Sequence, residues 1–457
     1  METKMRSSFS SRIGFVLAAA GSAVGLGNIW RFPYLAAKYG GGIFLLVYLI
    51  LAVTFGFSLM ITEIAIGRKT GLSCIGAYRT LDKRFGGLGW LASLIPMIIT
   101  PYYCVIGGWV LKYFFEYLTG QGTALSDPTY FDGFITFAAD SLLSNPLPWF
   151  LIYVLLTAAV VLLGVEKGIE KVSKVMMPVL VVLSVIVALF SLTMDGALEG
   201  LRFYIVPDFS NFSFKTVLAA MGQMFYSMSL AMGIMITYGS YMPAASNLER
   251  SVSQIEVFDT LIAFIAGLMI VPAVVAFNGG NPDGINAGPG LMFGTLPQVF
   301  ERMMLGHLVG GVFFLLVLFA ALTSSISLME TVVSIVSDRT GWRRRPAAIA
   351  VALFLVALGL PSCLGYGPLA FIQILGMSFL DFFDFLSNSV LMPIVAFFTC
   401  ILIGWVLGTK TVTDEVELNF RFHRKRLFEV MIRWVAPILV VCILIGQLLD
   451  VTGIMKL

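Results

Sequence analysis

The sequence predicts an all-α polytopic membrane protein with eleven transmembrane helices. Of the 457 residues, 58% are apolar and only 12% are charged, and the mean hydropathy is +0.93. Runs of about 18 or more mostly apolar residues indicate membrane-spanning helices, and continuous rather than alternating runs argue against membrane-spanning strands. The eleven spans are expected near residues 12–37, 41–68, 88–119, 147–164, 171–191, 215–241, 254–277, 308–336, 346–361, 380–408 and 428–450.

Lysine and arginine residues predict how these spans are oriented. They gather in the N-terminal segment and in alternate connections, whereas the connection 120–146 contains neither residue type. Positive charge marks cytoplasmic loops, so we expect a cytoplasmic N-terminus and, with an odd number of spans, an external C-terminus. The basic run Arg343–Arg345 is interpreted as such a topology signal rather than as a nucleic-acid-binding patch.

Several classes of site are disfavoured by the residue inventory. The five cysteines show no C-x-x-C spacing, so neither a disulfide framework nor a zinc site is predicted. The two histidines, His307 and His423, form no metal-ligand cluster or catalytic triad with nearby residues, which argues against an intramembrane enzyme.

The first apolar run is interrupted at residues 21–33, GSAVGLGNIWRFP. Two glycines four residues apart are typical of helix packing in membranes, but that explanation leaves a third glycine, Asn28 and Arg31 unaccounted for. A charge at this depth marks a pathway or a partner. The sixth run is interrupted in a similar way at residues 222–241, GQMFYSMSLAMGIMITYGSY.

Interruptions in matching spans predict an inverted repeat of two five-helix halves with a binding site at mid-membrane. The halves would cover residues 12–191 and 215–408, with an additional helix at 428–450, all within one transmembrane transporter domain over residues 1–457. Backbone groups freed at each break must line a cavity or meet a ligand. The helix that restarts near Gly27 favours an anion at its N-terminus, and the freed carbonyls favour a hard cation such as Na⁺.

Three motifs resemble the neurotransmitter:sodium symporters, especially their bacterial amino-acid transporters: GSAVGLGNIWRFPY, the stretch GQMFYSMSLAMG followed by TYGSY, and LTSSIS. The resemblance covers essentially the whole chain in order. It implies the leucine-transporter fold, a bacterial cytoplasmic membrane, and sodium-coupled import of a hydrophobic or aromatic L-amino acid by alternating access. The expected partners are the amino acid and the lipid bilayer, with no nucleic acid and no obligate protein partner.

The resemblance also implies two sodium sites. At the first site many relatives have asparagine where this chain has Asp259, and the position one turn later, a glutamate in other relatives, is Ala263. Asp259 would then supply the negative charge itself, so chloride-independent transport is expected. The first site would use Ala23, Asn28, Ser227 and Asp259, and the second Gly21, Val24, Ala320, Thr323 and Ser324. An alternative for the hydroxyls of the second site is a bond back to a carbonyl of their own helix.

The substrate class follows from Gly25, where monoamine transporters of the family have an aspartate that pairs with the amine. Without that side chain, the substrate must bring its own carboxylate to the first sodium site. The carboxylate would meet Leu26, Gly27 and Tyr103, and the ammonium would meet Ala23, Tyr226, Ser227 and Ser229. The side chain would face Ile99, Tyr103, Tyr226, Met232, Ser324 and Leu328.

The resemblance implies a gate on each side of this site, each built on an ion pair, and a partner of this kind is what an intramembrane arginine needs. The outer gate would consist of Arg31 and Asp384, with Gln223 nearby and Tyr226 as a lid, and the inner gate of Arg6 and Asp338, with Tyr241 nearby.

Three further residues have structural roles in the resemblance. Glu63 would accept hydrogen bonds from the broken segments, with an ordinary helix–helix hydrogen bond as the alternative. Gly168 and Pro178 would allow local unwinding at the start of the fifth span, with an ordinary proline kink as the alternative.

Two other functions stay open at this level. A proton-coupled amino-acid permease of the same architecture would not need sodium, so the sodium dependence of uptake separates it from a symporter. A channel or an inert regulatory membrane protein would lack paired gates above and below a closed site.

Overall fold

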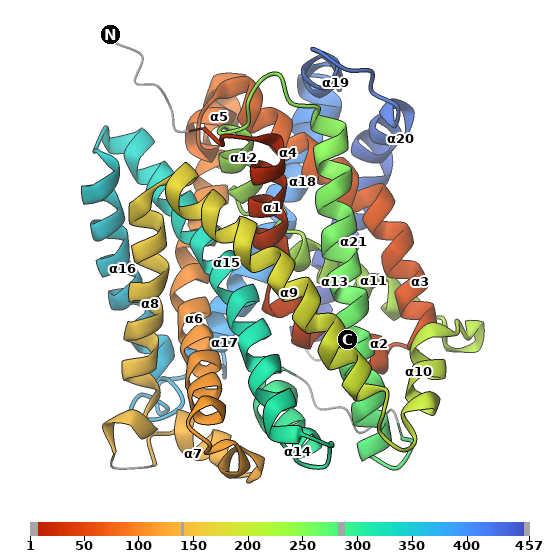
Figure 1. Ribbon diagram of the computed structural model, residues 1–457. Helices are drawn as coiled ribbons and strands as arrows, with labels where there is room; N and C mark the ends of the chain where they lie inside the picture. Colours follow the sequence, from red (N-terminus) through yellow and green to blue (C-terminus); the bar gives the residue numbers. More distant parts are fainter. Residues whose placement is uncertain (1–7, 139–140, 282–287, 452–457) are drawn as a thin grey trace.

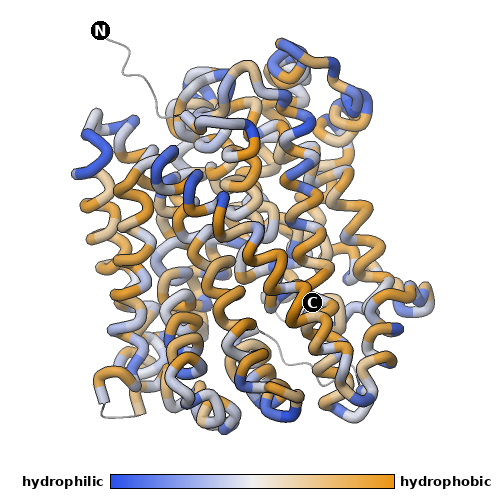
Figure 2. The backbone as a smooth tube through the Cα atoms, in the orientation of Figure 1, coloured by the Kyte–Doolittle hydropathy of each residue, from blue (hydrophilic) through white to orange (hydrophobic). Residues whose placement is uncertain are grey.

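The computed structural model describes residues 8–138, 141–281 and 288–451. Within these residues the chain folds into a bundle of helices that run mostly between two opposite ends of the molecule (Figure 1). Hydrophobic residues dominate the middle of the helices, and hydrophilic residues gather toward the two ends (Figure 2). This distribution is expected of a protein that spans a lipid bilayer.

The first five spans have the following elements. The first is α1 (Arg12–Ala23), η1 (Gly27–Arg31) and α2 (Phe32–Lys38), and the second is α3 (Gly42–Leu51), η2 (Ala52–Gly56) and α4 (Phe57–Thr70). After α5 (Cys74–Leu81), the third is η3 (Lys83–Phe85) with α6 (Gly86–Leu118). The short η4 (Gly122–Ser126), α7 (Tyr130–Ile135) and η5 (Leu142–Ser144) lead to α8 (Pro146–Leu163), the fourth span, and η6 (Val165–Glu170) with α9 (Lys171–Ser191) is the fifth.

The second half begins with α10 (Ala197–Ile205) and η7 (Phe209–Asn211). Its spans are α11 (Phe214–Ser227) with α12 (Ile234–Gly239), then α13 (Leu248–Phe277), α15 (Gly306–Thr340) and α16 (Arg344–Leu364), and η9 (Gly290–Thr295) and α14 (Leu296–Glu301) precede α15. The tenth span joins α17 (Phe379–Asp384), η10 (Phe385–Leu391), α18 (Met392–Ile401) and η11 (Leu402–Val406). After α19 (Lys410–Val416), the last span is α20 (Lys425–Val430), η12 (Met431–Val435) and α21 (Ala436–Val451).

The predicted all-helical fold with a broken first span is confirmed. In the described part of the chain, 9 helices are long and apolar enough to cross a membrane, and the pair Arg12–Ala23 and Gly27–Lys38, bent by 54°, makes 10. The predicted sixth span is present as α11 and α12, which the non-helical residues 228–233 separate. Because α11 has 14 residues and α12 has 6, neither half of this span is long enough to cross a membrane alone.

The two broken spans lie at the centre of the bundle. α1 packs against α9, α13 and α15, and α15 in turn packs against α6. α12 contacts α4 closely, since a methyl group at Gly67 would lie 1.9 Å from the carbonyl oxygen of Ile236. Glycine is therefore needed where the inner half of the sixth span crosses the second span.

Candidate functional site

The first break opens at Val24, whose extended backbone (φ −74°, ψ 97°) ends α1. A helical backbone resumes at Gly27, as the sequence predicted. Glycine is required there because a Cβ at this position would lie 2.5 Å from the ring of Tyr226 on α11. The side-chain amide of Gln223 also donates a hydrogen bond to the Gly27 carbonyl at 2.8 Å, so the outer half of the sixth span rests directly on the first break.

The second break contains two non-glycine residues with left-handed backbone, Ser229 (φ 52°) and Ala231 (φ 61°), followed by Gly233 (φ 73°). Such conformations are rarely adopted by residues with side chains and need support from their surroundings. Buried Glu63 on α4 provides part of this support, because its carboxylate accepts a hydrogen bond from the Ala231 N–H at 2.6 Å.

A small cavity lies between the two breaks. All twelve residues that the sequence assigned to the substrate line it, and Ser22, Asn28 and Ile234 complete its wall. The cavity volume is about 30 Å³, so the cavity is narrow in this conformation. The twelve are Ala23, Gly25, Leu26, Gly27, Ile99, Tyr103, Tyr226, Ser227, Ser229, Met232, Ser324 and Leu328.

Gly25 faces the most crowded part of this cavity. A Cβ at this position would lie 2.7 Å from the Ser324 hydroxyl oxygen and 3.0 Å from that of Tyr103. The Tyr103 oxygen also accepts a hydrogen bond from the Leu26 N–H at 3.3 Å. The chain thus leaves no space for an acidic side chain here, and it presents N–H and hydroxyl donors instead.

A buried carboxylate, that of Asp259, adjoins the cavity together with its hydrogen-bond donors. One carboxylate oxygen of Asp259 on α13 accepts hydrogen bonds from the Asn28 amide and the Ser227 hydroxyl, both at 2.8 Å. The other accepts one from the Tyr48 hydroxyl at 3.2 Å. Asp259 is fully buried, and no lysine or arginine among the described residues forms an ion pair with it. A buried carboxylate surrounded only by neutral oxygen and amide groups fits a monovalent hard cation.

The residues predicted for the second sodium site also lie close together. The Ser324 hydroxyl on α15 is 3.3 Å from the carbonyl oxygens of both Gly21 and Val24 at the end of α1. The Thr323 hydroxyl donates to carbonyls of its own helix, at Phe319 (3.0 Å) and Ala320 (3.1 Å). Thr323 therefore adopts the arrangement that the alternative interpretation predicted, while Ser324 bridges the two helices.

A larger cavity of about 340 Å³ lies on the predicted outer side of the small one, and Tyr226 lines both. Arg31 and Asp384 lie in the wall of this larger cavity without forming an ion pair. Arg31 is placed over the Tyr226 ring at 5.6 Å, and the Asp384 carboxylate accepts hydrogen bonds from Tyr102 (3.0 Å) and Asn388 (2.6 Å). The predicted outer partners therefore line the same cavity but are not paired.

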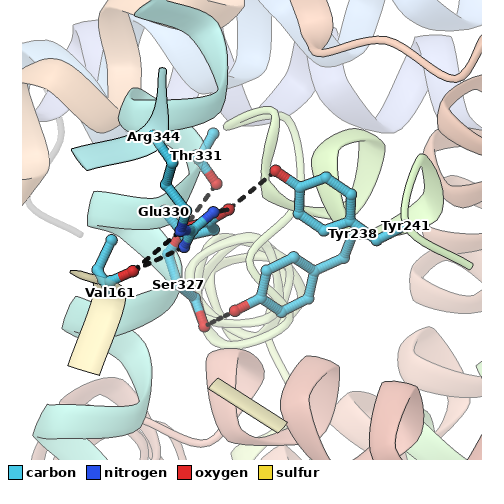
Figure 3. Close-up of polar contacts among 7 residues, drawn as sticks. All are labelled: Val161, Tyr238, Tyr241, Ser327, Glu330, Thr331 and Arg344. Atoms are coloured by element: carbon cyan, nitrogen blue, oxygen red, sulfur yellow. Dashed lines mark hydrogen bonds and ion pairs between the residues drawn. The ribbon is translucent and has the colours of Figure 1, made fainter. Parts of the chain in front are cut away.

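The predicted inner gate is only partly visible, because Arg6 lies outside the described residues. The carboxylate of Asp338 accepts a hydrogen bond from the Ser73 N–H at 2.8 Å, and the Tyr241 hydroxyl donates to Glu330 at 2.8 Å. Glu330 forms an ion pair with Arg344 at 2.5 Å (Figure 3). Arg344 belongs to the basic run interpreted above as a topology signal, and its side chain also forms this ion pair.

Gly168 lies in the π-helical segment η6, and Pro178 lies inside α9. A Cβ at Gly168 would be 2.2 Å from the carbonyl oxygen of Val160, so η6 packs tightly against the end of α8. The fifth span thus starts with irregular helix, which is a common feature of functional segments.

Comparison with known proteins decides the family. A model of the sodium:neurotransmitter symporter family matches residues 6–124 and 138–455. The chain belongs to this family. As a sodium:neurotransmitter symporter, it is a multi-pass membrane transporter and not an enzyme.

Several symporters of this family are similar along most of their length. The uncharacterized sodium-dependent transporter YhdH of Bacillus subtilis is 36% identical over 446 residues, which are 96% of this chain and 97% of the relative. The human sodium- and chloride-dependent taurine transporter is 28% identical over 90% of this chain and 73% of its own. The crystal structure of MhsT in complex with L-phenylalanine is 39% identical, with a TM-score of 0.86 over 96% of this chain and 99% of that one.

Some residues of the site were not predicted. Tyr48 occurs in the uniformly apolar run GIFLLVYLIL, where nothing distinguishes it from a lipid-facing residue. Ile234 follows the second break directly and lies in the cavity wall. Its position next to Gly233 is the one feature of the sequence from which this could have been predicted.

Proposed function

We propose that the protein is a sodium-coupled symporter that imports a hydrophobic or aromatic L-amino acid without requiring chloride. The observation that carries the proposal is the small cavity between the two helix breaks, which meets the buried Asp259 cluster on one side and apolar side chains on the other. The L-phenylalanine bound in the MhsT structure supports an amino acid of this class as the substrate.

The cavity divides into a polar part and an apolar part. The substrate carboxylate would meet the N–H groups of Leu26 and Gly27 and the Tyr103 hydroxyl, because the helix that restarts there stabilises an anion. The apolar part is formed by Ile99, Met232, Ile234 and Leu328. Methionine is flexible and fills irregular space, so Met232 suits substrates with large side chains.

Sodium would bind at two places that flank this cavity. At the first, Asp259, Ser227, Asn28 and the Ala23 carbonyl would hold the ion together with the substrate carboxylate, so that each ligand strengthens binding of the other. At the second, Gly21, Val24, Ala320, Thr323 and Ser324 would supply neutral oxygens.

Transport would follow alternating access between the predicted outer and cytoplasmic sides. Closure of Arg31 onto Asp384 over Tyr226 would seal the filled cavity from outside. Separation of the contacts around Asp338, Tyr241 and Glu330 would then open it toward the cytoplasm. Arg6 would add the ion pair with Asp338 that the family resemblance implies.

The decisive experiment is uptake by proteoliposomes with a panel of apolar and aromatic amino acids, with sodium or chloride replaced in turn. Uptake should require sodium and persist when gluconate replaces chloride. A proton-coupled permease would instead work without sodium. The Asp259→Ala variant should acquire chloride dependence or lose uptake, since nothing else in the cluster carries negative charge.

The Gly25→Ala variant provides a second test. Its methyl group would take up space within 3.0 Å of Tyr103 and Ser324, where the substrate carboxylate is expected. Uptake should fall at least about tenfold while thermal stability stays close to that of the unmodified protein, because the crowded atoms are side-chain hydroxyls. Unchanged uptake would place the substrate elsewhere.

A further inference from the structure

Arg433 is a charged residue within the last membrane-spanning helix. It lies in the π-helical segment η12, inside the apolar span Lys425–Leu449. It is exposed on the surface of the bundle rather than buried among the other helices. A charge inside a membrane span is costly without a partner, so the group that Arg433 meets there is a question of function.

The described residues supply only a small part of that partner. Among them, no carboxylate forms an ion pair with Arg433, and Glu429, one turn earlier on the same helix, forms none with it either. The guanidinium group donates one hydrogen bond, from Nη2 to the Thr409 hydroxyl at 3.2 Å. Because a guanidinium group has several N–H donors in one plane, most of them are left for a partner outside the protein.

Two tryptophan residues flank this arginine. Trp405 in η11 and Trp434 in η12 contact each other edge-to-face, with ring centroids 4.6 Å apart. The Trp405 indole N–H donates to the Arg433 carbonyl at 3.0 Å. Trp405 is 53% exposed and Trp434 is 56% exposed, so lipid can reach both. Indole rings concentrate at the level of the lipid headgroups, which places Arg433 at that level rather than at mid-membrane.

The crossing of the tenth and eleventh spans fixes this arrangement. A Cβ at Gly404 would lie 3.2 Å from the Ile432 carbonyl oxygen and 3.3 Å from the Arg433 Cα, so the two backbones touch. Both spans are π-helical here, a feature that is frequent at functional sites. Thr409 follows the end of the tenth span, so its bond directs the guanidinium group toward the predicted cytoplasmic end, where α19 and α20 lie (Figure 1).

We propose that Arg433, with Thr409, Trp405 and Trp434, forms a binding site for the phosphate group of an anionic phospholipid in the cytoplasmic leaflet. We call it the Arg433 site. A planar guanidinium group forms paired hydrogen bonds with phosphate oxygens, and the anionic lipids of this leaflet bring phosphate to the depth of the two indoles.

The ligand is a lipid rather than a free phosphate ion, because the surface beyond the indoles is apolar. Phe398, earlier in the tenth span, and Ile438, one turn after Trp434, are both exposed and lie toward the middle of the two spans. Acyl chains would cover these side chains while the headgroup meets Arg433. The site therefore joins a charge, an aromatic pair and an apolar surface in the order in which a phospholipid presents their partners.

Photocrosslinking in proteoliposomes locates the lipid directly. The probes are phosphatidylglycerol and phosphatidylcholine with the same diazirine-bearing acyl chain, each added in trace amount to the same vesicles. Adducts in peptides covering 398–409 and 430–441 should be at least about fivefold more abundant with phosphatidylglycerol. Equal adducts with both probes would overturn the proposal, because Arg433 would then merely extend into water at the membrane surface.

Arg433→Gln should abolish this preference in the two peptides, while adducts elsewhere on the protein stay unchanged and report intact folding. Arg345→Gln is the matched control, because it removes an exposed arginine at another predicted cytoplasmic connection, and it should leave the preference intact. A preference that survives in Arg433→Gln would refute the site. So would a preference that disappears on addition of inorganic phosphate, which would assign the site to a free anion.

Two milder variants test the proposal even if Arg433→Gln fails to fold. Arg433→Lys keeps the charge without the planar donors and should retain about half of the preference. Trp434→Leu keeps the arginine and the apolar surface, and it should lower the preference about twofold, because the headgroup loses one ring of the aromatic pair. An unchanged preference in both variants would overturn the proposal.

Discussion

The two sides of the central cavity are closed by different means. Toward the predicted outer side, Tyr226 lies between the small cavity and the 340 Å³ cavity, and Arg31 and Asp384 line the larger one without forming an ion pair. Toward the predicted cytoplasmic side, the described residues include an ion pair between Glu330 and Arg344. The Tyr241 hydroxyl also donates a hydrogen bond to Glu330. One side is closed by a single side chain, and the other by a network.

Aromatic packing reinforces this difference. Phe9 makes edge-to-face contacts with Phe15 (5.6 Å), Tyr238 (5.6 Å) and Tyr241 (6.3 Å), and its N–H donates to the Tyr241 carbonyl at 3.1 Å. Each aromatic pair contributes about 0.5–1.5 kcal/mol beyond burial alone. Opening the cytoplasmic side would break all of these contacts. We expect ligands to enter from the Arg31 side, where the larger cavity lies.

The largest expected effect comes from breaking the network in Figure 3 with Arg344→Gln. The Glu330 side chain is 0% exposed, and the substitution leaves it as a buried charge without a cation. Loss of one partner of a buried pair typically costs about 3–5 kcal/mol. Thermal unfolding in detergent should show a clearly lower midpoint for this variant.

Two further variants sharpen this test. Arg345→Gln removes an exposed arginine from the same run and should leave the midpoint unchanged. Arg344→Gln combined with Glu330→Gln removes both charges and should recover part of the loss, because no uncompensated charge stays buried. If the double variant were as unstable as the single one, packing rather than charge would account for the closure of this side.

Breaking the outer side should reduce transport without unfolding the protein. Asp384→Asn removes the charge that Arg31 needs on closure, and a charge-assisted hydrogen bond contributes about 1.5–3 kcal/mol. Uptake in proteoliposomes should fall about tenfold or more, since 1.4 kcal/mol corresponds to a factor of ten. The unfolding midpoint should change little, because Asp384 already has two neutral donors.

Asp381→Asn is the matched control for this variant. Asp381 lines the same cavity from the same short helix, but its carboxylate accepts bonds from Ser378 (2.7 Å) and Tyr366 (3.1 Å). A loss of uptake as large as that of Asp384→Asn would mean that the cavity's overall negative charge matters, and not one ion pair.

The sequence predicted this site better than it predicted its closure. Glycines, Asn28 and Arg31 inside an apolar run were enough to predict the first break, because such residues are costly in lipid without a partner. The positions carried over from the family resemblance then placed the twelve lining residues around one cavity. The first prediction depends on local sequence, and the second depends on the family resemblance.

The closure depends on contacts between different helices. Glu330 and Arg344 are separated by the end of α15, and the basic run that includes Arg344 resembles any cytoplasmic loop. Tyr48 likewise gains its role only when α3 packs near Asp259, 211 residues away. Pattern and composition cannot identify such pairs. A charged residue near a helix end fits the rule for membrane topology whether or not it has a partner.

The smallest expected effect tests how Asp384 is held before closure. The Tyr102 hydroxyl donates to the Asp384 carboxylate at 3.0 Å while Arg31 stands elsewhere, so this bond stabilises the open arrangement. A net contribution of about 0.5–1.5 kcal/mol is typical of such a bond. Tyr102→Phe should therefore favour closure and lower the substrate concentration for half-maximal uptake by a factor of about two to ten.

The direction of this change distinguishes two roles for Tyr102. If Tyr102 merely positioned Asp384 for Arg31, its loss would weaken closure, and half-maximal uptake would need more substrate rather than less. Tyr366→Phe removes the equivalent hydroxyl from Asp381 and should have little effect in either direction. A rise in the required substrate concentration for Tyr102→Phe alone would show that the outer pair keeps the Tyr102 bond when it closes, and that the open arrangement is held by Asn388 instead.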